Sequence, residues 1–356
     1  MKTNTFKLFV TAMVAGCGVV AGCTSDAPVE VENDHGLVEI KLNGGVNAVA
    51  ASATTKTPID GMVNGTDTWS GDLLVSFARA DEGESSYGDW QANALAGTVK
   101  KEKSESNDTH PITFEPSAYY QPNGKKTKLI GWYPQVNADG GDAFDATART
   151  VTFAAATMDG KTDYMVTEPV EGDKATDTQI KSVVFNHLLM QISVKAYTTD
   201  EKVLDIWGGI KSVSIKGLQQ KCMITLPEST AVLSETAKVA FSDTPTNPTD
   251  LPLVKADFKD NSAIDYIKSN PLGVGNATAA KLAGYAMFAP QADKDVILIV
   301  ETAKGRKQEA TVKAPQGGFL AGCSYEVVLK FSGSGIAPTV TIKDWETGAT
   351  VGEVEL

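Results

Sequence analysis

Short apolar runs, separated by turn residues, recur along most of this chain and constrain its fold more than any other feature. Residues 38–42 alternate apolar and polar side chains with a period of two, as a half-buried strand does. Fuller apolar runs, such as residues 129–133, are typical of strands that are covered on both faces. Helical patterns are few, and residues 263–268 and 277–282 are the segments that favour a short helix. The pattern predicts an all-β protein of antiparallel sandwiches rather than a doubly wound sheet. The other strand-like runs are residues 73–75, 183–185, 192–196, 213–215, 296–300 and 340–342.

A polar break at residues 171–177 interrupts this series of strands. Strand patterns resume directly after it. The chain is long enough for two domains of ordinary size. We therefore expect an N-terminal domain over residues 37–180 and a C-terminal domain over residues 181–356.

The first residues have the pattern of an export signal. Lys2 and Lys7 precede an apolar run of fifteen residues, 8–22, which is too short to span a bilayer. The run ends in Val-Ala-Gly-Cys, a lipobox in which Cys23 would carry the lipid, and Cys17 ends a second match of the same form. The polar residues after Cys23 suit a tether, so we favour Cys23. The sequence predicts a signal peptide over residues 1–22, a lipidated tether over residues 23–36, and a surface-exposed lipoprotein of the outer membrane.

Charge restricts the partners of the mature chain. The first 22 residues hold two lysines and no acid, so the remainder has 30 basic and 44 acidic side chains and a net charge of −14. Such a surface repels nucleic acid and anionic membrane faces.

Residues for catalysis or metal binding are scarce. His35, His110 and His187 are the histidines of the chain, and none has a histidine or cysteine at metal-ligand spacing. There is no G-x-S-x-G motif and no complete phosphate-binding glycine loop. We expect no enzyme, no cofactor and no metal site, and a structural role for His187.

Cysteines and aromatic residues leave alternatives open. Cys222 and Cys323 remain after export, and an oxidising compartment permits either a disulfide between them or two buried thiols. Tyr87 and Trp90 occupy a loop rich in Gly, Ser and Asp, where exposed rings could stack on sugars or could instead cover the end of a sandwich. We expect Trp132 and Trp345, which lie in strand-like runs, to be buried.

Several short motifs follow one another in a fixed order along the chain. A lipobox leads into an acidic tether and then into a basic residue, Lys56, ahead of a Trp-x-x-Gly-Asp-like motif. The motifs are Thr-Lys (55–56), Thr-Trp-Ser-Gly-Asp (68–72), Tyr-Tyr-Gln-Pro (119–122), Gly-Trp-Tyr-Pro (131–134), Asp-Tyr-Met (163–165), Phe-Asn-His-Leu (185–188), Phe-Leu-Ala-Gly-Cys-Ser-Tyr (319–325) and Ile-Lys-Asp-Trp (342–345). With these motifs in this order, the chain resembles the fimbrillin family, the pilins of type V pili and their lipoprotein relatives.

The resemblance implies two transthyretin-like β-sandwich domains in tandem and polymerisation by strand exchange. In strand exchange, one subunit completes the sheet of the next by β-augmentation. Family shaft pilins are cleaved after an arginine near the first strand, and here Lys56 occupies the matching position. Either a protease accepts lysine, or the subunit is an anchor, a tip or an unpolymerised relative.

Together these observations predict a structural fimbrial subunit or adhesin whose first strand, residues 38–42, is lost after cleavage at Lys56. Its partners would be other pilin subunits, the outer membrane through the lipid anchor, and a host or bacterial surface receptor. A surface glycan-binding lipoprotein that uses Tyr87 and Trp90 is the alternative. The donor strand would lie in residues 339–356, with Val340, Ile342, Val351, Val354 and Leu356 as the side chains that fill the neighbour's pockets.

Overall fold

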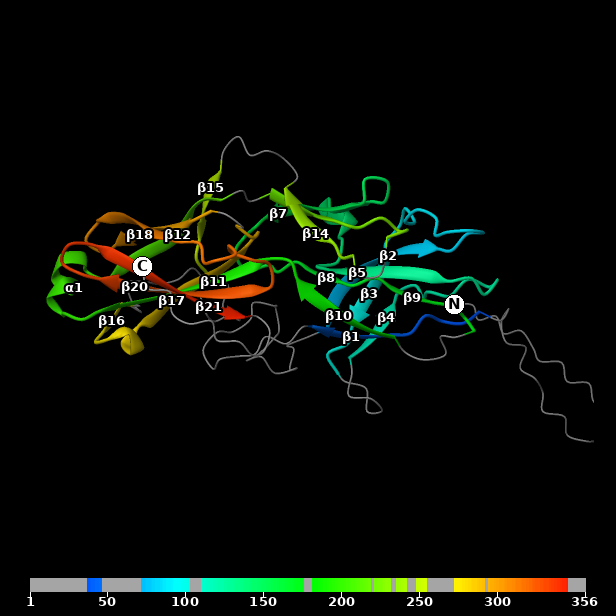
Figure 1. Ribbon diagram of the computed structural model, residues 1–356, viewed down its shortest axis with the longest axis horizontal. Helices are drawn as coiled ribbons and strands as arrows, with labels where there is room; N and C mark the ends of the chain where they lie inside the picture. The colour runs from blue at the N-terminus through cyan, green and yellow to red at the C-terminus, as the bar shows by residue number, and fades with distance from the viewer. Residues whose placement is uncertain are drawn as a thin grey trace, which may run out of the picture. The chain divides into compact units, whose positions relative to one another are not determined.

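The computed structural model describes residues 37–46, 72–102, 110–175, 181–218, 221–231, 235–241, 248–254, 272–291 and 294–344, and nearly all of its regular structure is β-strand (Figure 1). The helical segments of this described part are α1 (Lys202–Trp207), η2 (Ala138–Gly140) and η3 (Ala277–Ala279). The prediction of an all-β protein is confirmed. The arrangement as two transthyretin-like sandwiches in tandem stays a prediction.

The expected short helices are largely replaced. Of residues 277–282, only η3 is helical, and Lys281 already begins strand β17 (Lys281–Phe288), because β17 pairs along β11 (Met190–Thr198) and is held extended. Residues 263–268 lie outside the described residues. Helix α1 was not predicted. It ends at Gly208, whose left-handed φ of 68° lets its N–H reach the carbonyl of Leu204.

The N-terminal sheet closes on itself. Following the ladders from β2 through β3, β4, β1, β10, β8 and β5 leads back to β2, and β9 joins β5 alongside β8. A closed ring leaves these seven strands without a free edge over most of their paired length. The seven strands of the ring are β2 (Leu73–Asp81), β3 (Leu95–Val99), β4 (His110–Phe114), β1 (Leu42–Val46), β10 (Lys181–His187), β8 (Met165–Thr167) and β5 (Thr127–Tyr133), and β9 (Val170–Gly172) is the eighth strand of the sheet.

The ring encloses its own hydrophobic core. The ring centroids of Phe77 lie 5.4 Å from Phe114 and 6.2 Å from Phe185, both edge to face. Gly131 on β5 faces Phe77, and a Cβ there would lie 2.5 Å from the phenyl ring, so only glycine fits. The outward face of β2 and β5, including the fully buried Trp132, belongs to a second and larger core.

Three further sheets share this larger core. One is built on β11, with β17 on one side and β16 (Leu272–Val274) and β20 (Cys323–Phe331) on the other, and β21 (Ile336–Asp344) beside β20. A second has the order β15 (Thr249–Pro252), β12 (Ile210–Leu218), β18 (Val296–Thr302) and β19 (Lys307–Val312). The third has the order β14 (Lys238–Phe241), β13 (Lys221–Thr225), β7 (Thr150–Thr157) and β6 (Ala143–Asp145).

Sheet membership crosses residue 180. Strand β10, which follows that position, lies in the ring with β1, and β7, which precedes it, pairs with β13. The division into domains 37–180 and 181–356 stays a prediction, and the hydrogen-bonded sheets do not divide there.

The loop after β13 is fastened to the N-terminal half by side chains. The buried Lys128 ammonium donates to the carbonyls of Ser229 and Ala231, at 2.9 Å each. The indole N–H of Trp90 donates to the carbonyl of Pro227 at 2.9 Å. We call these contacts the Lys128 clamp. Buried carbonyls that β-pairing leaves unpaired thereby obtain donors.

Candidate assembly site

Strand β1 occupies a slot between two other strands of the ring (Figure 1). It runs parallel to β10, with Leu42 opposite Lys181, and antiparallel to β4, with Leu42 opposite Ile112. It is the first described strand of the chain, and it is nevertheless internal to its sheet. We therefore consider this slot as the candidate functional site.

The predicted first strand is shifted in the structure. Residues 38–42 were expected as the strand, whereas the continuous ladder begins at Leu42. Before it, Ile40 donates its N–H to the carbonyl of Ala118, and Val38 accepts from Tyr120. Strand β4 ends at Phe114, so residues 115–117 interrupt the ladder and the chain ahead of β1 pairs with a separate segment.

The expected alternation is observed across this shift. Ile40 and Leu42 are each 2% exposed and lie in the core of the ring, with Val38 packed at its margin. Full burial of a large aliphatic side chain stabilises a fold by about 1.5–3 kcal/mol. The segment therefore holds its slot mainly through two side chains.

The two glycines of β1 have different surroundings. Gly44 faces the core, and a Cβ there would lie 2.8 Å from a methyl carbon of Val99 and 3.1 Å from Ile112. Gly45 faces the other way, with no heavy atom within 4 Å of a Cβ. The slot is therefore deep at Ile40 and Leu42 and closed at Gly44, and it admits only a strand with a very small residue at that point.

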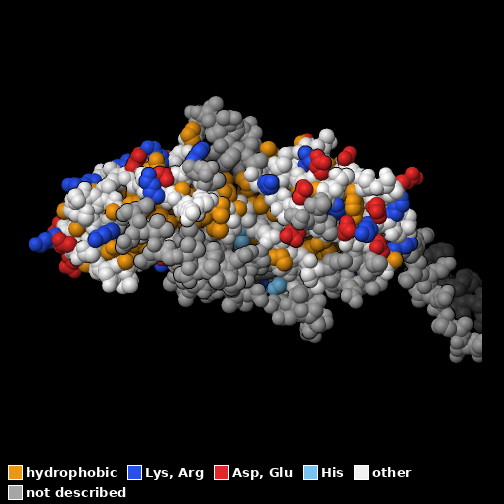
Figure 2. Space-filling model, viewed as in Figure 1, with side chains coloured by type: hydrophobic (Ala, Val, Ile, Leu, Met, Phe, Trp, Pro, Cys, Tyr) orange, Lys and Arg blue, Asp and Glu red, His pale blue; other side chains and the backbone are white. Residues whose placement is uncertain are grey.

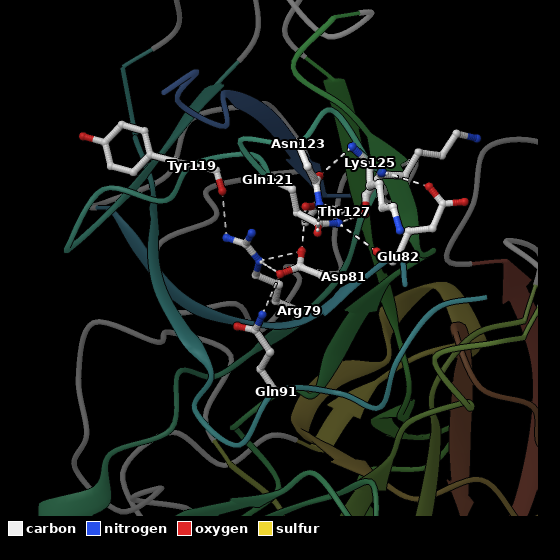
Figure 3. Close-up of polar contacts among 10 residues, drawn as sticks. Arg79, Asp81, Glu82, Gln91, Tyr119, Gln121, Asn123, Lys125 and Thr127 are labelled. Atoms are coloured by element: carbon white, nitrogen blue, oxygen red, sulfur yellow. Dashed lines mark hydrogen bonds and ion pairs between the residues drawn. The ribbon is translucent and has the colours of Figure 1, made fainter. Parts of the chain in front are cut away.

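A polar network holds the segment that pairs with the chain ahead of β1 (Figure 3). The Arg79 guanidinium bonds the Asp81 carboxylate, at 3.0 Å from Nε to Oδ1, and donates to the carbonyl of Tyr119 at 2.8 Å. Gln91 and Thr127 also donate to Asp81, at 2.9 and 2.7 Å. Arg79 thus holds in place the segment on which the chain ahead of β1 is paired.

The sequence analysis did not identify Arg79 and Asp81, although the signal was available. Alternate residues of a strand share a face, so both side chains continue the inward row of Leu73, Val75 and Phe77. Two opposite charges that follow a row of apolar side chains on one strand face indicate an ion pair that covers the end of the hydrophobic core.

Tyr87 and Trp90, the candidate stacking residues, both contact other parts of the same chain. Trp90 is only 4% exposed, with its indole N–H bonded to the carbonyl of Pro227, and this burial favours the second of the two alternatives for it, a ring that covers the end of a sandwich. The Tyr87 hydroxyl donates to Glu171 at 2.7 Å, and the Lys128 ammonium lies 4.2 Å from the ring centroid. Burial, followed by the bond to Glu171, raises the pKa of Tyr87, and burial lowers the pKa of Lys128. One face of Tyr87 is therefore taken by a cation–π contact.

Most other candidate residues fall at the ends of the chain. Val340 is 5% exposed and packs in the larger core from β21, opposite Val327 of β20, so it already fills a pocket of its own sheet. Ile342 pairs with Tyr325 in the same ladder. Cys17, Cys23, Lys56, Trp345, Val351, Val354 and Leu356 lie outside the described residues.

The disulfide alternative stays a prediction. Cys323 begins β20 half-buried against the larger core. Cys222 lies on β13, opposite Phe241, and its side chain is outside the description.

His187 has the structural position expected for it. It is buried at the end of β10, and its Nδ1 is paired with the carboxylate of the buried Asp163.

Among the residues that the structure describes, no group of three acidic, histidine or cysteine side chains is arranged to hold a metal ion. None of the described helices has the length and apolarity needed to cross a membrane. On the face that Figure 2 shows, acidic and basic side chains are intermixed.

Comparison with known proteins agrees with the motifs. Two crystal structures described as cell adhesion proteins share the fold: one from Bacteroides uniformis, with 16% identity and a TM-score of 0.51 over 86% of this chain and 98% of that one, and one from Bacteroides ovatus, with 14% identity and a TM-score of 0.52 over 88% and 99%. No curated protein has a matching sequence. The model of the fimbrillin-like family matches residues 62–345, which is most of the chain. The protein therefore belongs to the fimbrillin-like family.

Proposed function

We propose that the protein is a structural subunit of fimbriae, exported as a lipoprotein and assembled by exchange of β1 for a strand of a neighbouring subunit. Family membership supports the role of a fimbrial subunit at the cell surface. The slot of β1 is the observation that carries the mechanism. The role is structural, with no catalytic step.

The lipid anchor is the first part of the proposal. The Val-Ala-Gly-Cys motif supports acylation of Cys23, and the acyl chains would anchor the protein in the outer membrane. Replacing Cys23 by serine should release the protein from membranes or block its maturation. Acyl chains found on Cys17 by mass spectrometry would contradict this choice of site.

The position of β1 supports its exchange. It is the first described strand, and it precedes Lys56. A cut after Lys56 would therefore break the covalent link between β1 and the rest of the ring. Its sequence, Leu-Asn-Gly-Gly-Val, contains two glycines, each about 0.5–1 kcal/mol less favourable than alanine in a strand. Part of its pairing is parallel, which is slightly less stable per residue. A locally weak strand at an internal position is suited to replacement.

The empty slot would bind a strand strongly. Loss of β1 would expose the pockets of Ile40 and Leu42, at about 25 cal/mol per Å² of apolar surface. It would also leave the facing edges of β4 and β10 without their partner. An incoming strand restores both the main-chain hydrogen bonds and the apolar contacts.

The donor is the C-terminal segment of a neighbour. Val340 is already committed to the larger core, so the donating part begins after Asp344. That part contains two glycines, Gly348 and Gly352, and Gly352 is the one within residues 349–356 that can take the closed position at Gly44. Placing Gly352 there puts Thr350, Val354 and Leu356 on the inward face, and Val351 on the outward face.

The test uses the chain that begins at Thr57, with and without residues 349–356. Polymers visible by electron microscopy should form only when the C-terminal segment is present. Gly352→Val should prevent assembly because of the contact with Val99, whereas the matched change Thr350→Val should permit it. A Thr57 chain that stays monomeric at high concentration, or that polymerises without residues 349–356, contradicts the mechanism.

The processing site has its own test. The N-terminal residue of the protein recovered from cells distinguishes cleavage after Lys56 from an uncleaved lipoprotein. Thr57 at the N-terminus supports an exchanging subunit with a protease that accepts lysine. Cys23 at the N-terminus supports an anchor, tip or unpolymerised member.

A further inference from the structure

A pocket separate from the slot of β1 opens where β2 begins and the chain leaves β5. Its volume is about 500 Å³, within the range of small-ligand sites. Leu74, Tyr133 and Pro134 contribute apolar surface, and Asn137 and Asp139 contribute polar groups. Neither the proposed assembly mechanism nor the loop of Tyr87 and Trp90 uses these residues.

The chain after β5 is held in a fixed shape. Gln135 donates its N–H to the carbonyl of Leu74 and its side-chain amide to the carbonyl of Val75, both at 3.0 Å. Val136 donates to the hydroxyl of Ser76 at 3.1 Å. A site that is ordered before binding loses less conformational entropy when the ligand arrives.

The turn that carries the polar groups is also capped. Asn137 is the N-cap of η2, and its side-chain oxygen accepts from Gly140 at 3.2 Å. Its own N–H donates to Asp142 at 3.0 Å. Asp139, within η2, is exposed at the rim of the pocket.

An exposed leucine marks one side of the pocket. Leu74 is 54% exposed, the highest value among the exposed large apolar side chains of the described residues. Its neighbours on β2, Leu73 and Val75, are buried in the core of the ring. An apolar side chain in this position, beside a half-buried tyrosine and a proline, is typical of a recognition surface.

The arrangement excludes two other ligands. A β-strand adding to the edge of β2 that β3 leaves open would use the carbonyl of Leu74, and the N–H of Gln135 already occupies it. A metal ion lacks ligands, because Asp72 is bonded to Lys100 at 3.1 Å and to the N–H of Lys101 at 2.8 Å.

We propose that this pocket binds a neutral carbohydrate. A sugar ring has one face of C–H groups that packs on Leu74 and Pro134, and hydroxyls that donate to Asp139 and bond the amide of Asn137. No lysine or arginine lies among the described residues that line the pocket, and Asp139 repels anionic sugars, so sialylated and sulfated glycans are disfavoured.

The experiment presents the purified full-length mature chain, with Cys23 replaced by serine, to an array of neutral, sialylated and sulfated glycans. Neutral glycans should bind, and the affinity of the best one is then measured by isothermal titration calorimetry. Leu74→Ser and Asp139→Ala should each weaken that affinity about tenfold or more. Both side chains are exposed, so neither change is expected to unfold the protein.

Leu320→Ser is the matched control, because Leu320 is also exposed, at 49%, and lies outside the pocket. It should leave the affinity unchanged. The proposal is overturned if no neutral glycan binds, if sialylated or sulfated glycans bind best, or if Leu320→Ser weakens binding as much as Leu74→Ser. Assembly by strand exchange is measured separately, so each proposal can fail without the other.

Discussion

The first and last described strands of the chain combine position and sequence in opposite ways. Strand β1 is five residues long, has two glycines, and lies between two partners inside a closed ring. Strand β21 is nine residues long and pairs along its whole length with β20, which is its only ladder partner in the described part of the chain. One strand is short, glycine-rich and internal, and the other is longer, continuously paired and peripheral.

From this difference we infer that position in a sheet alone does not determine how firmly a strand is held. An internal strand contributes two ladders, but glycines reduce both its intrinsic propensity and its buried side-chain area. An edge strand with continuous pairing and a buried Val340 can be permanent. A chain that exchanges strands needs both kinds: a replaceable strand at one end and a fixed base for the donor at the other.

The largest expected effect is the loss of β1. In a background that lacks residues 349–356, so that no strand can be donated, beginning the chain at Thr57 should strongly lower the unfolding temperature. Empty pockets at Ile40 and Leu42 each correspond to about 2–5 kcal/mol. A synthetic peptide of residues 37–46 should restore part of the loss. Equal unfolding temperatures with and without β1 would show that the ring does not depend on this strand.

Trp132, which lies on neither of these two strands, shows how much a permanently buried side chain contributes to the free energy of unfolding. Trp132 is fully buried, with its ring centroid 5.3 Å from that of Phe144. Trp132→Ala should lower the free energy of unfolding in urea by about 3–5 kcal/mol. The control is Leu320→Ala at an exposed site, which should change it by at most about 0.5 kcal/mol. A near-neutral Trp132→Ala would mean that the ring is not part of the core.

The two glycines of β1 offer a matched pair. Gly44→Val forces a methyl group against Val99 and should destabilise the protein by about 1–3 kcal/mol. Gly45→Val meets open space and should be neutral or slightly stabilising, because valine favours strands. Adding Val99→Ala to Gly44→Val should recover stability by making room. If both glycine variants behave alike in thermal unfolding, the slot is not closed at Gly44.

The smallest effect concerns a charged pair at the rim of the ring. Bonds from Lys126 and then from Tyr87 hold the pKa of Glu171 below its usual value of 4.5. A lowered folded-state pKa stabilises the protein above the unfolded pKa, and this contribution disappears as pH falls through the folded value. Glu171→Gln should therefore lower stability at pH 7 by less than about 1 kcal/mol, and the difference should shrink as pH falls below the unfolded value of 4.5 and vanish below the folded-state pKa. A difference that grows in acid would contradict this assignment.

Local patterns predicted local structure well, and pairing between distant segments much less. The alternation of residues 38–42 correctly indicated buried Ile40 and Leu42, and the apolar run around Trp132 correctly indicated a core strand. The closure of the ring through β2 and β5, and the parallel pairing of β1 with β10, depend on contacts between residues far apart in the sequence. Period-two patterns fix a strand's faces but not its partners.

The same limit applies to the candidate site. Trp90 lies among Gly, Ser and Asp residues and resembles an exposed loop residue, yet it is buried and bonded to the carbonyl of Pro227, which is distant in the sequence. The depth of the slot at Gly44 is set by Val99 and Ile112 from other strands. Neither neighbour is visible from the residues around the position itself.

The Lys128 clamp has a mechanical consequence. Its bonds to Ser229 and Ala231 radiate from one ammonium group, and the bond from Trp90 to Pro227 acts on the same loop. A force that pulls this loop outward loads these bonds together rather than one after another. In the filament proposed above, such a joint would keep each subunit stiff between its neighbours and leave extension to the strands that are proposed to exchange.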